Sequence, residues 1–235
     1  MTKLTYGQAR NIIYQSHVCL AIRQGATGDT LALLPGTIIR SDGIVATSAS
    51  LFRSLNTKEL KETVDVMVLD TKETYKGVLL DVDLCSNIAF VKMLSGRPQK
   101  VAKLGKLDFL VPGSMAVAAG CHVRHGILRH AECHLSRGSF GHVGLGKMIA
   151  ASCFRFMKAL LVGGPLIDTN VGVLGVINSM GSQIKATPID DVLKYLERME
   201  KHGSMIETGW KSKLWTLLSI VALRYNACFI VELLR

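Results

Sequence analysis

Short apolar runs separated by turn residues constrain the fold of this chain more than any other feature. The runs are rich in Val, Ile and Leu, and Gly, Asp, Ser or Pro follow them. Such runs are typical of β-strands. We expect strands at residues 17–22, 31–40, 44–47, 64–69, 74–80, 88–93 and 115–119. Their regular spacing predicts an all-β barrel or sandwich, and two small barrels joined near residues 95–106 also fit.

Two local signals complete this pattern. Asp42-Gly43 lies between apolar runs, where Asp-Gly is a strong signal for a tight hairpin turn. Near the other end, apolar residues follow Pro188 at helical spacing until Gly203. The chain therefore predicts one amphipathic helix after the strands, and residues 4–14 favour a short leading helix.

The segment Leu161–Asp168 contains Gly-Gly-Pro-Leu and precedes another apolar run. Gly-Gly-Pro alone is a common turn signal. Other landmarks occur around it in a fixed order. They are Gly36–Ile39, Asp42–Ser50, Asp83–Lys92, Leu104-Gly105, Val111–Gly113, Val117–Gly120, Gly163–Leu166 and Pro188–Asp190.

In this order, the landmarks resemble the protease domain of the Deg/HtrA (Do-like) family of trypsin-fold serine proteases, and in particular its divergent plant members. The resemblance covers residues 15–203 and implies a trypsin-like double β-barrel with a C-terminal helix. It leaves no room for the family's PDZ domain before the chain stops.

The resemblance assigns the family's catalytic triad to three positions that carry other residue types. The His position is Ser50, the Asp position is Asn87 and the nucleophile position is Val162. A serine hydroxyl is not a general base near neutral pH, and an asparagine lacks the charge that stabilises an imidazolium. Valine has no nucleophilic atom. The family's glycine two residues before the nucleophile is Leu160, which lacks the backbone freedom of glycine.

We therefore expect a pseudoprotease, a catalytically inactive module that binds polypeptides or regulates other proteins and needs no cofactor. It would bind a protein partner and assemble with itself or with related proteins. The alternative is an active serine endopeptidase of the Deg/HtrA family in proteolysis or protein quality control. A third class, a metal-binding or nucleic-acid-binding protein, would use a segment rich in His and Arg.

That segment holds six residues of the types that bind zinc. They are Cys121, His122, His125, His130, Cys133 and His134. Their spacing matches no standard zinc motif, so we expect no metal and interpret the segment as a surface hairpin. The net charge of +10 suits an acidic partner, but no run of Lys and Arg indicates nucleic acid.

The apolar tail, residues 204–235, differs in character from the rest. Leu214–Leu223 is almost entirely apolar, Arg224 interrupts it, and residues 227–234 are apolar again. Three interpretations remain open: a helix packed on the barrel or on another subunit, membrane association through residues 211–235, or an ending without stable order. An arginine in mid-bilayer is costly, which weighs against the second.

The start of the chain lacks the apolar core of a secretory signal. The six cysteines show no regular spacing, so we expect reduced thiols and an intracellular protein. Cytoplasm or nucleus is favoured over an organelle.

Overall fold

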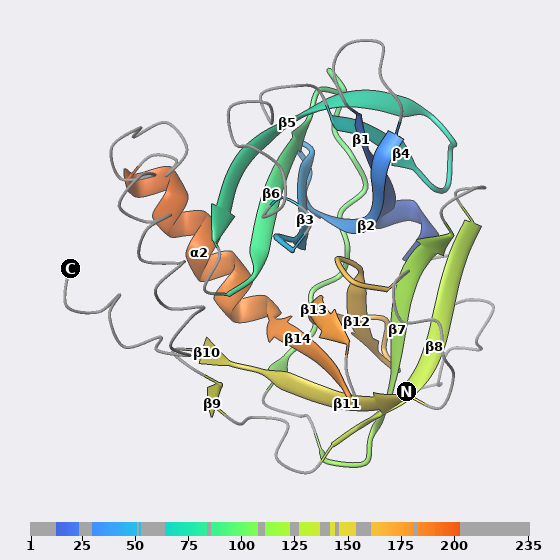
Figure 1. Ribbon diagram of the computed structural model, residues 1–235, viewed down its shortest axis with the longest axis vertical. Coiled ribbons are helices and arrows are strands. Elements are labelled where there is room, and N and C mark those ends of the chain that lie inside the picture. Colours follow the sequence, from blue (N-terminus) through green and yellow to red (C-terminus); the bar gives the residue numbers. More distant parts are fainter. Residues whose placement is uncertain are drawn as a thin grey trace.

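Two closed β-barrels lie one above the other, and a helix covers one side of both (Figure 1). This arrangement comes from a computed structural model, and the predicted all-β double barrel with a C-terminal helix is confirmed. The structure describes residues 13–23, 30–50, 52, 64–83, 86–107, 111–122, 127–136, 142–143, 146–153, 161–180 and 183–202. The expected tail helix and residues 4–12 of the leading helix lie outside this part, and residues 13–16 are helical.

The first barrel has the strand order β1-β2-β3-β6-β5-β4, and β4 pairs with β1 to close it. Its strands are β1 (His17–Arg23), β2 (Thr30–Arg40), β3 (Ile44–Ser48), β4 (Val64–Val68), β5 (Thr74–Asp83) and β6 (Ile88–Met93). The Asp42-Gly43 hairpin forms as expected: the Gly43 amide donates to the Arg40 carbonyl over 3.0 Å, and Gly43 has a φ of 93°. A positive φ suits glycine because it has no Cβ.

The second barrel has the order β11-β14-β13-β12-β7-β8. Its strands are β7 (Met115–His122), β8 (Ile127–Leu135), β11 (Ile149–Cys153), β12 (Pro165–Asp168), β13 (Val173–Met180) and β14 (Ile184–Pro188), with a separate pair, β9 (His142–Val143) and β10 (Gly146–Lys147). The hairpin expected at residues 121–134 is formed by β7 and β8, whereas we did not anticipate β11 or β14. Strands β11 and β14 hold small and polar residues, so their strand character depends on pairing with neighbours rather than on a hydrophobic run.

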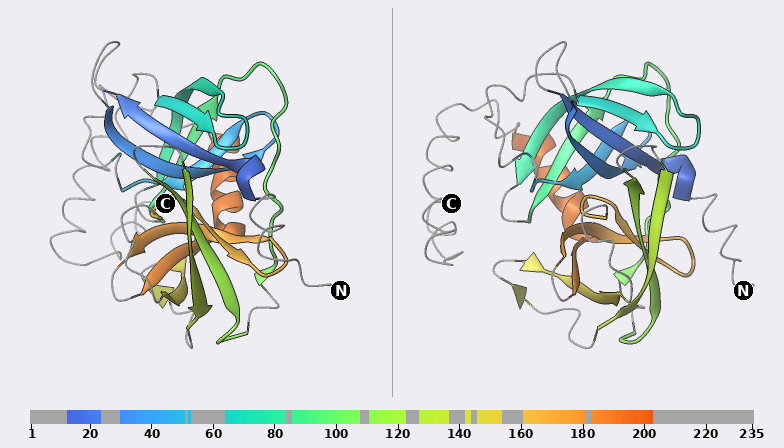
Figure 2. Two further views of the ribbon diagram at one scale, coloured as in Figure 1. Left: turned by 90° about the vertical axis from the view of Figure 1, so that its right-hand side faces the viewer. Right: turned by 45° about the vertical axis from the view of Figure 1, so that its right-hand side comes forward.

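The connection between the barrels contacts both of them. It leaves β6 at Leu94 and reaches β7 at Met115, along one side of the molecule in Figure 2. The Ala102 amide donates to the Ile38 carbonyl of the first barrel over 2.9 Å. The next residue, Lys103, accepts a bond of 2.8 Å from the Val173 amide of the second barrel. The connection therefore fixes the barrels relative to each other.

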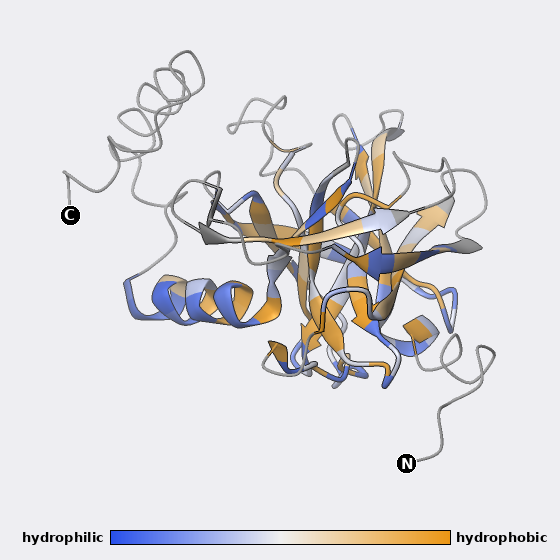
Figure 3. Cartoon of the chain, turned by 90° about the horizontal axis from the view of Figure 1, so that it is seen from below, coloured by the Kyte–Doolittle hydropathy of each residue, from blue (hydrophilic) through white to orange (hydrophobic). Residues whose placement is uncertain are grey.

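Helix α2 (Ile189–His202) packs on both barrels. Hydrophobic and hydrophilic residues alternate along it (Figure 3), and Ile189, Val192 and Leu196 are buried. Its Tyr195 ring stacks on Phe90 of β6 at a centroid distance of 5.6 Å, and the Tyr195 hydroxyl donates to Asp81 over 2.7 Å. No helix among the described residues is long and apolar enough to cross a membrane.

Three hydrophobic clusters fill the molecule, one inside each barrel and one between them. The cluster between the barrels also lies beneath α2. Strand alternation explains the division, because successive side chains point to opposite faces of a sheet. On β1, Val18 and Leu20 enter the first barrel, whereas His17 and Cys19 face the second.

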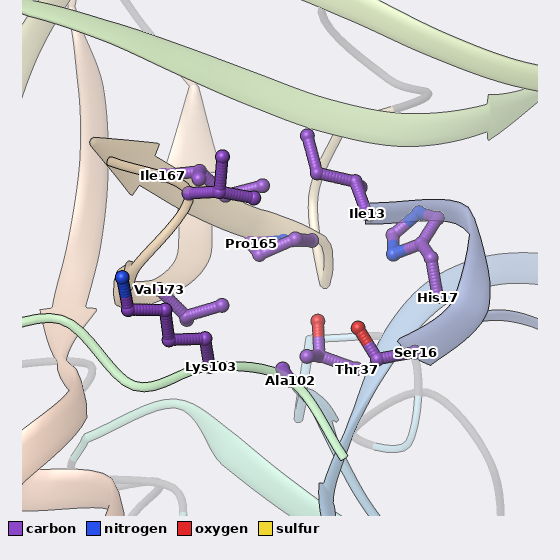
Figure 4. Close-up of a pocket in the computed structure, with 10 residues that line it drawn as sticks. Ile13, Ser16, His17, Thr37, Ala102, Lys103, Pro165, Ile167 and Val173 are labelled. Atoms are coloured by element: carbon purple, nitrogen blue, oxygen red, sulfur yellow. The ribbon is translucent and has the colours of Figure 1, made fainter. Parts of the chain in front are cut away.

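His17 lies at this interface beside a cavity of about 10 Å³ (Figure 4). The side chain is 1% exposed, and burial lowers its pKa to about 4, partly offset by the Gly120 backbone. Within the part of the chain that the structure describes, neither ring nitrogen makes a hydrogen bond of normal geometry, and the Thr37 hydroxyl on the same cavity also has no partner there. The cavity is about the size of one water molecule, and a water in it would hydrogen-bond to both the His17 ring and the Thr37 hydroxyl.

We predict that His17 makes the fold sensitive to acid. The unfolded chain binds a proton at His17 below about pH 6.5, whereas the folded protein does so only near pH 4. The free energy of unfolding should therefore fall as the pH drops through this window, by up to about 3 kcal/mol. The His17→Gln variant should lose this pH-dependent part of the free energy of unfolding, whereas the exposed control His202→Gln should keep it. Urea denaturation at about pH 7 and about pH 4.5 measures both variants. Equal pH dependence in both variants would contradict the prediction.

Candidate functional site

Ser50 and Asn87 lie side by side at one end of the first barrel. Strand β3 pairs antiparallel with β6, with Ser48 opposite Ile88. Ser50 follows the end of β3, and Asn87 precedes the start of β6. The Ala49 amide donates to the Asn87 carbonyl over 3.0 Å, which extends the ladder by one bond.

The turn that carries Val162 comes from the second barrel and lies against this end of β3. A Cβ on Gly163, which follows Val162, would be 2.6 Å from the Thr47 hydroxyl and 2.6 Å from the Pro35 carbonyl oxygen. Gly163 also has a φ of 98°, a region that L side chains rarely adopt. The fold thus gathers the three positions assigned by the resemblance around the interface between the barrels.

Hydrogen bonds to β13 hold the turn in place. The Gly163 amide donates to the Ile177 carbonyl over 2.7 Å, and the Ile177 amide donates to the Gly164 carbonyl over 2.8 Å. A Cβ on Gly164 would lie 1.8 Å from the Ala119 carbonyl oxygen of β7, which is an impossible distance. Val162 is partly buried in this turn and offers only carbon atoms.

The hydroxyl at the His position is bonded to a second hydroxyl. Ser50 Oγ and Ser48 Oγ are hydrogen-bonded to each other, and the Ser50 amide donates to Ser48 Oγ over 3.2 Å. Within the described hydrogen bonds, neither serine contacts an imidazole or a carboxylate. A hydroxyl stays protonated at neutral pH, so this pair, in its described contacts, has no base that would activate it.

The amide at the Asp position joins the two barrels. Asn87 Nδ2 donates to the Asn178 carbonyl of β13 over 2.8 Å, while Asn87 Oδ1 is buried and has no hydrogen-bond partner among the described residues. Asn178 Nδ2 donates to Thr187 Oγ1 over 2.8 Å, and Thr187 Oγ1 donates to the Ser86 carbonyl over 2.7 Å. Asn87 has a φ of 56°, which asparagine tolerates better than most residues. The groups at the triad positions therefore form a neutral network of amides and hydroxyls, and at its edge the Ser86 hydroxyl donates to the Asp83 carboxylate.

Asn178 and Thr187 were missed by the sequence analysis. Both lie in the second barrel, and their partner Ser86 lies in the first, separated from Thr187 by 101 residues. No motif in the chain links these three residues. Only the docking of the barrels brings them together.

The zinc candidates are divided among different environments. Cys133 is buried in the core of the second barrel, Cys121 is buried between the barrels, and His130 and His134 are exposed. His122 ends β7, and His125 lies outside the described residues. Within the described part of the chain, no three side chains of metal-binding type converge.

Comparison with known proteins gives one informative relative. No model of a known protein family matches the sequence. The chain is 31% identical over 222 residues to the Putative protease Do-like 14 of Arabidopsis thaliana. The match covers 87% of this chain and 50% of that protein, so the chain spans about half the length of this relative.

We predict that Asn87→Asp destabilises the fold at neutral pH. A carboxylate oxygen would face the Asn178 carbonyl oxygen where an N–H now donates. The expected cost is about 1–3 kcal/mol, because the Asn178 carbonyl loses its donor and two acceptors then face each other in a part-buried site. This repulsion raises the pKa of the new carboxyl group, so stability should recover as the pH falls and the protonated acid donates to Asn178.

The matched control is Asn170→Asp, the same change at an exposed turn residue, which should alter the free energy of unfolding by less than about 0.5 kcal/mol. Urea denaturation at about pH 7 and about pH 4.5 measures both variants. An Asn87→Asp variant as stable as the parent at neutral pH would show that a carboxylate fits this site.

Proposed function

The double barrel belongs to the Deg/HtrA (Do-like) family of trypsin-fold proteins, and we propose that this chain is a pseudoprotease within it, which binds polypeptides without cleaving them. Family membership supplies the scaffold, whereas the activity depends on the residues of the site. The relative's printed name describes a putative protease, and this supports an active endopeptidase as the alternative.

The neutral network at the triad positions carries the proposal. Hydrolysis by this fold needs a nucleophile, a base that takes its proton and a group that orients the base. Val162 offers no nucleophilic atom, Ser50 is bonded to Ser48, and the Asn87 amide is bonded to the Asn178 carbonyl. Removing one triad member from an enzyme leaves little beyond the contributions of binding and the oxyanion hole.

A free strand edge beside this network supports binding of a polypeptide. The pairing of β12 with β13 begins at Pro165, which lies opposite Val176, and it continues away from the site. Beyond the site, Ser179 and Met180 pair with Lys185 and Ile184 of β14, and no described strand pairs with their other side. An extended peptide can add to such an edge through backbone hydrogen bonds. The edge follows Asn178 directly, so a bound peptide would pass the triad positions.

We predict that the purified protein does not cleave dye-quenched, unfolded casein and does not react with a fluorophosphonate probe for active serines. An active trypsin-fold protease serves as the positive control. Cleavage that the probe abolishes would overturn the proposal in favour of the endopeptidase. Variants Ser48→Ala and Ser50→Ala, tested in parallel, would then show whether one of these hydroxyls had become the nucleophile.

A triple variant with Val162→Ser, Ser50→His and Asn87→Asp tests whether these three positions correspond to those of the catalytic triad. Cleavage by this variant, with none by the natural protein, would establish both the assignment and the loss of catalysis. The variant must first be shown to be folded, because Asn87→Asp alone is expected to be destabilising.

We also predict that the protein binds unfolded casein, as measured by fluorescence anisotropy of the labelled polypeptide. An unlabelled, extended casein peptide should displace the labelled casein, because both would add to the strand edge through their backbone N–H donors. The same peptide with alternate amides methylated should displace it at least about ten-fold less well, a difference of about 1.4 kcal/mol. Equal displacement by the two peptides, or no binding of casein, would contradict binding at the β13 edge.

A further inference from the structure

Two buried thiols meet between the barrels. Cys19 of β1 and Cys121 of β7 are 3% and 1% exposed, and both are free. The Cys121 thiol donates a hydrogen bond to the Cys19 sulfur, with the two sulfur atoms 3.1 Å apart. These residues are 102 positions apart in the sequence. The pair plays no part in the network at the triad positions.

Strand alternation places each thiol at the interface. On β1, Val18 and Leu20 fill the first barrel, which leaves Cys19 facing outward. On β7, Ala116 and Ala118 fill the second barrel, and Cys121 faces outward in the same way. Each sulfur is therefore directed from a rigid strand toward the opposite barrel.

We propose that Cys19 and Cys121 are a site of reversible oxidation, at which a disulfide bond joins the two barrels. A disulfide has a sulfur–sulfur bond of about 2.05 Å, so the two sulfur atoms need to approach by only about 1 Å. The oxidant we propose is a peroxide, which is small enough to enter a closed interface.

The reaction balances in two steps. The Cys19 thiolate attacks one oxygen of hydrogen peroxide, the O–O bond breaks, and a sulfenic acid and, after protonation, water form. The Cys121 sulfur then attacks the Cys19 sulfur, its proton passes to the hydroxide that departs as the S–O bond breaks, and a second water leaves. Two thiols and one peroxide thus give one disulfide and two waters. A small dithiol reverses the bond by exchange.

The surroundings favour Cys19 as the attacking thiol. The hydrogen bond from Cys121 lowers the pKa of Cys19 against the effect of burial, and the positive charge of Lys72 acts in the same direction. The same hydrogen bond and burial raise the pKa of Cys121, which keeps its proton. The thiolate is the reactive form of cysteine, so the first oxidation belongs to Cys19.

The disulfide would tie together the two strands that hold the Gly163-Gly164 turn. Cys19 pairs with Pro35, whose carbonyl oxygen closely approaches Gly163. Cys121 lies two residues after Ala119, whose carbonyl oxygen closely approaches Gly164. Oxidation should therefore make this turn more rigid as well as the barrel interface.

The test uses the full-length protein, treated with hydrogen peroxide, alkylated and digested without reduction. Mass spectrometry should find the peptides of Cys19 and Cys121 linked, with a mass two hydrogens lower than the sum of the two separate peptides. Treatment with dithiothreitol should separate the two peptides. Oxidation should raise Tm by about 5 °C, because the bond closes a long loop in the unfolded chain. Hydrogen exchange at the Gly163 and Gly164 amides should also become slower.

Cys19→Ser and Cys121→Ser should each abolish the linked peptide and the rise in Tm. Cys133→Ser, at a buried thiol in the core of the second barrel, is the matched control and should keep both. Unreacted thiols after peroxide, linkage of either cysteine to another one, or a sulfinic acid at Cys19 would overturn the proposal. If a variant fails to fold, the linked peptide of the natural protein and its reversal still decide the question.

Discussion

The approach of the Gly163-Gly164 turn to the first barrel is the contact on which the rest of the site depends. Backbone oxygens and a hydroxyl occupy the space that side chains at these two positions would need. The turn can therefore lie directly on the end of β3, and its hydrogen bonds to β13 then align the second barrel with the first. The pairing of β3 with β6 sets the positions of Ser50 and Asn87, and this close contact places Val162 against the same end of β3.

The interface around this contact is built from neutral groups. His17 is uncharged at neutral pH because burial lowers its pKa to about 4, and Asn87 binds Asn178 through an amide rather than a carboxylate. Burying an unpaired charge is far more costly than burying a bonded amide. Under the proposal of a pseudoprotease, the neutral groups that suit a packed interface also stand where acid–base catalysis would require ionisable ones.

The thiol pair and the strand edge both adjoin strands that contact the Gly163-Gly164 turn. Cys19 pairs with Pro35, whose carbonyl oxygen lies close to Gly163, and Ile177 of β13 bonds to the turn just before the edge at Ser179 and Met180. A covalent bond between the thiols would limit movement of the turn, and the edge, which no described strand covers, is where a peptide would bind in our proposal. Both proposals therefore concern how firmly the two barrels are held together.

Local signals in the sequence predicted many strands, the Asp42-Gly43 hairpin, the hairpin at residues 121–134 and α2, because apolar runs, turn residues and helical spacing are read from neighbouring residues. These signals left a barrel or a sandwich open, and the double barrel followed from the family resemblance. They did not reveal β11 or β14, whose small and polar residues become strands only by pairing. The bond from Asn87 to Asn178 and the contact of Cys19 with Cys121 join residues 91 and 102 positions apart. Only tertiary structure decided these contacts, because each exists only when one barrel docks on the other.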